Sequence, residues 1–345
     1  MIIKHTPEDF IVKEIPLKEW DDTGPYAVFR LTKIGLNTEQ AIDIISKRFH
    51  IPSNIIKYSG TKDKHAHTTQ YISIPTKPNI GKLYIDEENL KMAHVGFSDE
   101  PLSLGTLAGN RFMITLREIS SESIAALRHK DLTRFLIPNY FDEQRFSSNN
   151  YNIGLHILKK DYKKATEYMC ESSDIYADTA RIYLAAHPND YIGALKKIPK
   201  KTLLMFIHSV QSYIFNEALA KILIGDASSR NIESYAVAYS LGKLVFYDTV
   251  QEYDYVKETE SLDLIGFDTH TINHHIKHIL EEKGITLRDF IIRAIPDMSV
   301  EGTTRECFVE VKSLEVHMLE DRAIIEFDLP KGSYATIVVK ALFNE

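Results

Sequence analysis

The chain has 345 residues, of which 44% are hydrophobic and 26% charged, and its formal net charge is −7. This composition is ordinary for a globular protein, and the length favours two domains over one. Because no apolar run approaches the ~20 residues of a membrane span, and the two cysteines lack the spacing of a zinc site or a disulfide framework, we expect a cytoplasmic protein that does not enter a membrane.

The first part of the chain reads mainly as strands. Alternating apolar residues predict strands over residues 8–16 and 27–35, and Phe10 lies on the apolar face of the first one. Residues 37–49 then predict an amphipathic helix, because the segment begins with capping-box spacing and continues with apolar residues at helical intervals.

The segment YSGTKDKHAHTTQ, residues 58–70, precedes the next predicted strand and places Asp63 between two lysines. A carboxylate surrounded by cations should stay ionised at neutral pH and can act as a nucleophile. A solvated charged turn explains the same residues. His65 and His67 beside Asp63 also allow a metal or nuclease site, although the segment offers no second carboxylate.

The same segment bears on the partner. A net charge of −7 argues weakly against nucleic acid, because phosphate binding usually needs a cationic surface. Cationic and histidine side chains nevertheless gather between residues 57 and 67, whereas acidic residues concentrate at 248–268. This segregation is compatible with an RNA-binding cleft on an acidic protein.

A further strand is predicted over residues 111–119, followed by a helix over 120–136. Asn110 and Phe112 would share one face of that strand, where an amide can read a polar edge and a ring can hold a planar group. A turn asparagine followed by a core phenylalanine is the alternative. The aromatic segment NYFDEQRF, residues 139–146, indicates either a domain hinge or a nucleic-acid contact.

Helices dominate the middle of the chain, and strands return near its end. Helical periodicity occurs over 161–173, 178–187, 201–223 and 269–284, a hairpin is predicted over 233–250, and strands over 307–319, 323–330 and 333–343. His270, His274 and His278 have zinc-compatible spacing, which a solvated helix face explains as well. The pattern predicts an α+β fold with a largely antiparallel sheet and one domain inserted into another.

No Gly-rich nucleotide loop is present, since GTLAG at residues 105–109 lacks the ending of a P-loop and no GxGxxG occurs. We therefore expect chemistry that depends on neither ATP nor NAD.

Taken together, these segments resemble the TruD family of tRNA pseudouridine synthases. The matching blocks, in the family's order, are Lys4 ahead of PEDFIVKE, then YSGTKDKHAHTTQ, LGTLAGNRFMITLRE, PNYFDEQRFS, SYIFNEAL and FDLPKGSYATIVVKAL. The family's glycine in NYFG is Asp142 here, and the glycine after QRF is Ser147. Both departures fall at the expected domain junction.

The resemblance implies a pseudouridine-synthase-type α+β domain with a mixed, largely antiparallel sheet, built from residues 1–135 and 296–345. It also implies an inserted TRUD domain over residues 136–295, in a V-shaped molecule with RNA between its two lobes. The implied reaction detaches uracil from C1′ of a tRNA uridine, conventionally number 13 in the D-arm, and reattaches it through C5. No cofactor, metal ion or obligate protein partner is implied.

Residue by residue, Asp63 matches the family's nucleophile and Lys4 the cation that holds it ionised. The carboxylate attacks either C1′ or C6, and the sequence leaves both open. Phe10, Asn110, Phe112 and Tyr334 match positions that contact the substrate nucleotide, with Phe112 under the uracil, where most other pseudouridine synthases have tyrosine. Tyr334 aligns with a position that is commonly phenylalanine, so its hydroxyl has no assigned role.

Two other functions remain open. A metal-dependent RNA hydrolase would use Asp63, His65 and His67, and a non-catalytic module would bind or fold tRNA without any covalent step.

Overall fold

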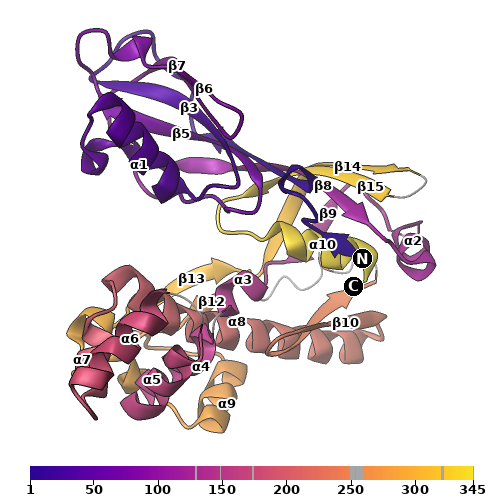
Figure 1. Cartoon of the computed structure of the whole chain (residues 1–345). Helices are drawn as coiled ribbons and strands as arrows, with labels where there is room; N and C mark the ends of the chain where they lie inside the picture. The colour runs from indigo at the N-terminus through magenta and orange to yellow at the C-terminus, as the bar shows by residue number, and fades with distance from the viewer. Residues whose placement is uncertain are drawn as a thin grey trace. The chain divides into compact units, whose positions relative to one another are not determined.

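The computed structural model describes residues 1–128, 130–147, 149–172, 175–248, 253, 260–319 and 322–344. Over these ranges the chain is an α+β protein with one large, mostly antiparallel sheet, as the sequence predicts (Figure 1). Within them, no helix combines the length and the hydropathy that crossing a bilayer requires. Part of the predicted hairpin and of the acidic stretch at 248–268 lies outside the described residues.

The large sheet is formed mainly by the two ends of the chain. Its strands are β1 (Ile2–Ile3), β2 (Phe10–Pro16), β3 (Tyr26–Ile34), β4 (Lys57–Tyr58), β5 (His67–Pro75), β6 (Ile85–Asp86), β7 (Leu90–Ser98), β8 (Leu107–Arg117), β9 (Phe135–Pro138), β14 (Phe308–Met318) and β15 (Arg322–Pro330). Hydrogen-bonded neighbours follow the order β6-β7-β3-β5-β2-β8-β15-β14-β9, with β1 on β8 and β4 on β5. β2 and β5 run parallel, whereas β3–β5, β3–β7, β2–β8, β8–β15 and β14–β15 are antiparallel.

Helix α1 (Thr38–Phe49) covers one face of the sheet beside β3 and β5 (Figure 1). Its capping box is present, since Asn37 Oδ1 accepts a hydrogen bond of 2.7 Å from the Gln40 N–H. The apolar stripe of α1 packs on alternate residues of the strands. This core includes Ala27, Phe29, Leu31, Ala41, Ile42, Ile45, Ile72 and Ile74.

The helix predicted over 120–136 is wrong in its second half. Helix α2 spans Ser121–Arg128, and the chain then turns and enters β9. Asp131 explains the turn, because its carboxylate accepts hydrogen bonds from both the N–H and the hydroxyl of Thr133. Such local side-chain acceptors compete with helical hydrogen bonds.

The strand predicted over 333–343 is also wrong, because residues Ala335–Phe343 form helix α10. Its β-branched residues favour a strand by propensity, but seven of its nine residues are buried (Ala335, Ile337, Val338, Val339, Ala341, Leu342 and Phe343). A short segment that is apolar all round carries no period by which helix and strand can be told apart.

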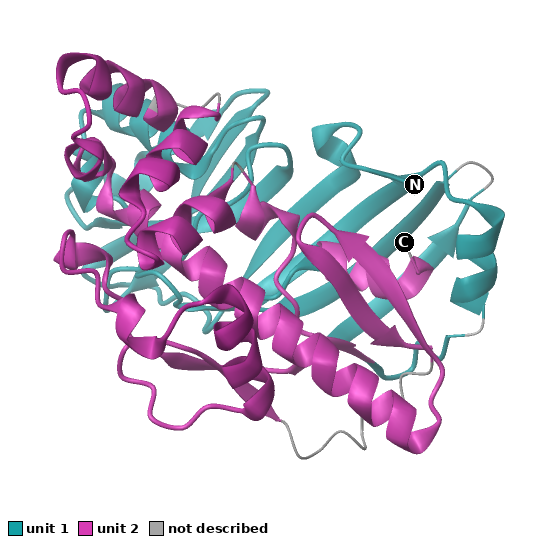
Figure 2. Cartoon of the chain, turned by 90° about the horizontal axis from the view of Figure 1, so that it is seen from below, with its two compact units in different colours: residues 1–135, 310–335 teal, residues 136–309, 336–345 magenta. Residues whose placement is uncertain are grey.

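Contacts divide the chain into two compact units (Figure 2). The first unit comprises residues 1–135 and 310–335, and the second comprises residues 136–309 and 336–345. The second unit therefore contains all of the expected insertion, 136–295, and extends beyond it. The predicted domain boundaries, at residues 135–136 and 295–296, stay predictions.

The second unit is built around the long helix α8 (Lys200–Arg230), which packs against α4, α9 and β11. Its other elements are α3 (Glu143–Phe146), α4 (Asn150–Leu158), α5 (Tyr162–Cys170), α6 (Ile175–Ala186), α7 (Tyr191–Lys196), β10 (Ser234–Tyr239), β11 (Gly242–Tyr247), β12 (Ser261–Leu264), α9 (His274–Lys283) and β13 (Thr303–Glu306). The predicted hairpin is the β10–β11 pair, and Gly284 ends α9 in the left-handed conformation.

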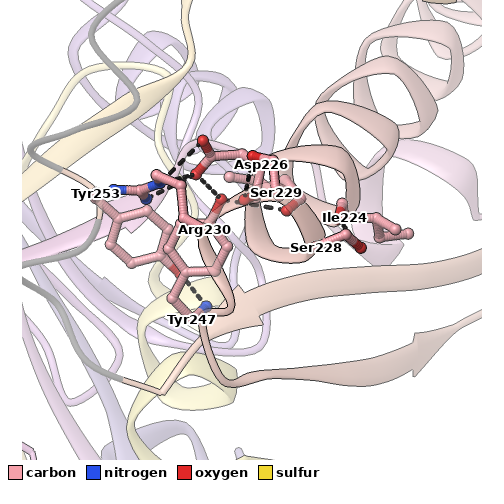
Figure 3. A network of polar contacts seen from close by, with 8 residues as sticks. Ile224, Asp226, Ser228, Ser229, Arg230, Tyr247 and Tyr253 are labelled. Atoms are coloured by element: carbon pink, nitrogen blue, oxygen red, sulfur yellow. Dashed lines mark hydrogen bonds and ion pairs between the residues drawn. The ribbon is translucent and has the colours of Figure 1, made fainter.

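Polar contacts fix the C-terminal end of α8 to β11 (Figure 3). The Asp226 carboxylate pairs with the Arg230 guanidinium one turn later and accepts a 2.7 Å hydrogen bond from the Tyr247 hydroxyl. The Tyr253 hydroxyl in turn accepts a hydrogen bond of 2.7 Å from the Tyr247 N–H. The end of β11 is thus held against the last turn of α8.

Two helical glycines give opposite predictions for stability. A Cβ on Gly154 of α4 would lie 2.1 Å from the Phe206 main-chain oxygen of α8, whereas a Cβ on Gly225 would meet nothing within 4 Å. Gly154→Ala should therefore lower the free energy of unfolding by about 1–3 kcal/mol through overpacking. Gly225→Ala should raise it by about 1 kcal/mol through helix propensity. Urea unfolding of both variants tests this, and a stabilised Gly154→Ala protein would contradict the close packing of α4 on α8.

Candidate active site

Asp63 and Lys4 meet near the N-terminal ends of two neighbouring strands, β2 and β5, although 59 positions separate them in the sequence. The parallel pairing of β2 with β5 explains the meeting, because Ile11 lies opposite His67 and both strands begin at the same edge. Residues just before β2 and just before β5 are therefore brought together.

The Asp63 carboxylate uses both of its oxygens. Oδ2 accepts a hydrogen bond from Lys4 Nζ, and Oδ1 accepts one of 3.0 Å from the His65 N–H. The side chains of Lys4 and Asp63 are 27% and 24% exposed, so solvent and a ligand can reach the pair. Lys4 Nζ also lies 4.2 Å from the centroid of the Phe10 ring, which places the ammonium within cation–π distance.

Lys4 adopts a left-handed backbone conformation, with φ of 61°. A side chain other than glycine in this region costs about 1–2 kcal/mol per residue. Such strain persists only where the surrounding structure fixes it, here by β1 on β8 before Lys4 and by the 3₁₀ turn Pro7–Asp9 after it.

The electrostatics of the pair favour the ionised carboxylate. Burial raises the pKa of Asp63, but the hydrogen bond and the charge of Lys4, together with the His65 N–H, outweigh it and hold the pKa below its usual range. Asp63 is therefore a carboxylate at neutral pH, in the protonation state that a nucleophile needs.

The Phe10 ring beside Lys4 contacts a second ring, Phe112 of β8. The Phe10 and Phe112 rings meet edge-on with centroids 6.1 Å apart, and Phe112 stacks on Phe327 at 5.4 Å. Asn110 lies two residues before Phe112 on β8 and so shares its face of the strand. Its Oδ1 is buried and has no hydrogen-bond partner among the described residues, an arrangement that a ligand N–H would satisfy.

Tyr334 is placed less closely than the other expected site residues. It lies half-buried just before α10, four residues after Pro330, which pairs with Gly109 next to Asn110. The Lys331 ammonium in the same turn donates a 2.8 Å hydrogen bond to the Gly105 carbonyl. These pairings bring the turn toward the Asn110 end of β8 but establish no contact between Tyr334 and Asp63.

The histidines near Asp63 do not assemble a chelating group. His65 is exposed and contributes its main-chain N–H, while the His67 side chain lines a surface hollow with Thr69 and Tyr71 on the other face of β5. Over the described ranges, no three His, Cys, Asp or Glu side chains are grouped so that they could hold a metal ion, and this includes the histidines of α9.

Lys62, which precedes Asp63 in the sequence, points into the protein. Its ammonium lies 2.9 Å from the Glu14 carboxylate, and both side chains are almost fully buried. Burial is the largest effect on Glu14 and raises the pKa of its carboxyl, with Lys62 acting in the opposite direction. Two further buried polar residues, Lys33 and Gln70, were not predicted; each is a polar residue on the apolar face of a predicted strand.

Comparisons with known proteins identify the family of this chain. The family model of tRNA pseudouridine synthase D (TruD) matches residues 1–182 and 176–342. A probable tRNA pseudouridine synthase D 1 of Methanococcus maripaludis is 32% identical over 400 residues, covering 100% of both chains. The tRNA pseudouridine synthase D of Aquifex aeolicus is 30% identical over 384 residues, covering 99% of this chain and 97% of its own.

The chain belongs to the TruD family. Its fold agrees as well, since the crystal structure of a putative TruD protein from Methanosarcina mazei superimposes with a TM-score of 0.66 at 27% identity. That superposition covers 99% of this chain and 93% of the other.

The departures from the TruD glycine pattern leave the backbone unstrained. Asp142 has φ of −112° and Ser147 φ of −54°, which any residue can adopt. Asp142 gains a buried ion pair, because its Oδ1 lies 2.5 Å from Lys340 Nζ. The aromatic rings of this segment are buried in the core of the second unit, so they are not free to stack on bases (Tyr140, Phe141 and Phe146).

Replacement of Lys4 by methionine should raise the pKa of Asp63, because desolvation remains while the lowering hydrogen bond and charge are lost. Protonation would then remove the nucleophile at a higher pH than in the wild type. Pseudouridine formation by Lys4→Met should fall most at the acidic end, by about tenfold for each unit of pKa shift. The rates are measured from about pH 5 to about pH 8.

The matched control is Lys18→Met, which removes an exposed lysine whose ammonium lies 3.6 Å from the Asp21 carboxylate. Its profile should follow the wild type. A loss by Lys4→Met of the same factor at every pH would contradict the electrostatic role of Lys4.

Proposed function

We propose that this TruD-family tRNA pseudouridine synthase isomerises a tRNA uridine to pseudouridine with Asp63 as the nucleophile. The observation that carries the proposal is the partly exposed Asp63–Lys4 ion pair beside Phe10. An ionised carboxylate that a ligand can reach, at the end of a set of aromatic and amide groups, suits attack on a nucleotide better than a structural role.

The reaction needs no external reactant in this scheme. Asp63 forms a bond to the nucleotide, and the bond between C1′ and N1 breaks. The bond between C1′ and C5 then forms, and the bond to Asp63 breaks, which restores the carboxylate. N1 gains a proton and C5 loses one, so the product is an isomer and no electrons are transferred overall. The residues of the site therefore have to bind and orient the nucleotide, supply the Asp63 nucleophile and accept the C5 proton.

Recognition of the base is assigned to Asn110, Phe112, Phe10 and Tyr334. The unpartnered Asn110 Oδ1 can accept a hydrogen bond from a uracil N–H, which would satisfy a buried acceptor. The Phe112 ring, 7% exposed and backed by Phe327, offers a rigid apolar surface to the base. These contacts offset the free energy of roughly a few kcal/mol that is needed to extrude a stacked base.

The finer features of the function are expectations carried by the family resemblance and the composition. We assign the modified nucleotide to position 13 in the tRNA D-arm and the enzyme to the cytoplasm. We expect tRNA as the partner, without an obligate protein subunit.

Asp63→Asn should abolish pseudouridine formation and leave the tRNA dissociation constant within about twofold of the wild type. The amide keeps the shape of the side chain but cannot act as the nucleophile. Pseudouridine is mapped in tRNA incubated with each protein, and binding is measured separately. The control is Asp43→Asn, which removes an exposed carboxylate paired with Lys47 on α1.

Retained turnover by Asp63→Asn would refute the nucleophile. A wild-type protein that binds tRNA but forms no pseudouridine would indicate the non-catalytic binding module instead.

Treatment with EDTA distinguishes the isomerase from a metal-dependent hydrolase. In a buffer of monovalent salt that keeps the tRNA folded, EDTA should leave the pseudouridine yield unchanged, and the RNA should keep its full length on a denaturing gel. Shortened RNA that disappears with EDTA would instead support hydrolysis by Asp63, His65 and His67.

A further inference from the structure

Beneath the Asp63 loop lies a buried cation that the proposed chemistry does not use. Lys33 is the penultimate residue of β3, and its side chain is 0% exposed. Its Nζ donates hydrogen bonds to the main-chain oxygens of Leu36 at 2.6 Å, Asp63 at 2.9 Å and Lys62 at 3.3 Å. An ammonium group has three protons, and these three carbonyls take all of them.

Two further buried side chains hold the same loop. Thr38 Oγ1 accepts a 2.9 Å hydrogen bond from the Lys62 N–H and donates one of 2.9 Å to Gln70 Oε1. Gln70 Nε2 donates to the Gly60 carbonyl at 3.2 Å. We call Lys33, Thr38 and Gln70 the loop clamp, because β3, α1 and β5 each supply one side chain that contacts residues 60–63.

Burying an ammonium group beneath a loop carries a large desolvation free energy. Burial disfavours the charged form and lowers the pKa of Lys33 to about 8, with Lys62 acting in the same direction and the charges of Asp63 and Glu39 opposing it. An apolar side chain at this position would avoid the desolvation cost. The ammonium group is therefore better explained by its hydrogen bonds to the loop carbonyls than by a contribution to the stability of the fold.

We propose that Lys33 is a positioning residue for the isomerisation, which in its protonated form fixes the main chain at residues 62–63 so that the Asp63 carboxylate meets Lys4 and the substrate. This inference rests on the proposed role of Asp63. A neutral amine has two protons for three carbonyls and turns a lone pair toward one of them, so the loop loosens when Lys33 loses its proton.

The pH dependence separates this role from general stability. Since the pKa of Lys33 falls from 10.5 to about 8 on folding, the unfolded state binds more protons between these values, and the contribution of Lys33 to the free energy of unfolding rises with pH there. Above about pH 8 Lys33 loses its proton and the loop loosens, so wild-type kcat should fall there. Because the same loss of the proton does not destabilise the fold, the fall in kcat would not reflect unfolding.

The test compares kcat and tRNA binding for the wild type, Lys33→Met and the control Lys47→Met from about pH 6.5 to about pH 9. Lys47 is exposed and pairs with Asp43 on α1, so its replacement should change nothing. Lys33→Met should lower kcat by about 10- to 100-fold at pH 7, as a small displacement of a catalytic group does. Its tRNA dissociation constant should stay within about twofold, and its profile should lack the alkaline fall.

A second variant covers the case in which Lys33→Met does not fold. Thr38→Val removes two contacts of the loop clamp but no titrating group, so it should lower kcat and keep the alkaline fall. If both single variants fold, the double variant should lose about as much as the worse single variant, because residues that act as a unit are not additive.

The inference is overturned by a wild-type kcat that stays flat to about pH 9, or by Lys33→Met with wild-type kcat. It is also overturned if Lys33→Met and Thr38→Val lose tRNA binding and melting temperature whenever they lose kcat, because such a pattern indicates a purely structural role. Failure of the nucleophile looks different, because Asp63→Asn would then stay active whatever Lys33 does.

Discussion

The ion pair between Lys4 and Asp63 depends on a pair of parallel strands within a mostly antiparallel sheet. Antiparallel neighbours would send the segments before β2 and β5 to opposite edges, whereas the parallel pair brings both to one edge. The long connection through β3, α1 and β4 is what permits that pairing, because parallel neighbours require a crossover. Once the edge is shared, a lysine near the start of the chain and a loop aspartate become a single electrostatic unit.

The two strand residues of the loop clamp, Lys33 and Gln70, lie on the face of the sheet that packs against α1. Lys33 and Gln70 occupy alternate positions beside Leu31 and Ile72, where the packing with α1 would otherwise take apolar groups. Polar side chains in such places are tolerated only when they are hydrogen-bonded, and here their partners are main-chain groups of the Asp63 loop. The core thus supplies the rigidity that an exposed loop lacks.

The sequence predicted the elements whose pattern is regular and missed what depends on distant partners. The capping box at Asn37 and the alternation in β5 are local signals, and both elements formed. In α10 the apolar residues have no period, so burial decided the structure against propensity. The lysine of the ion pair was found through family resemblance, while Lys33 and Glu14 escaped notice, because which carbonyl or cation a buried side chain meets is set only by tertiary structure.

Lys4 combines a left-handed backbone with the ammonium group that contacts Asp63. Glycine adopts that conformation without steric penalty, and asparagine does so readily, so either residue would relax the main chain. Both would also delete the ammonium that faces Asp63. If Lys4 has the proposed role, selection for heat resistance alone would favour glycine at position 4 and would yield more stable but slower enzymes, unless modification of RNA were selected at the same time.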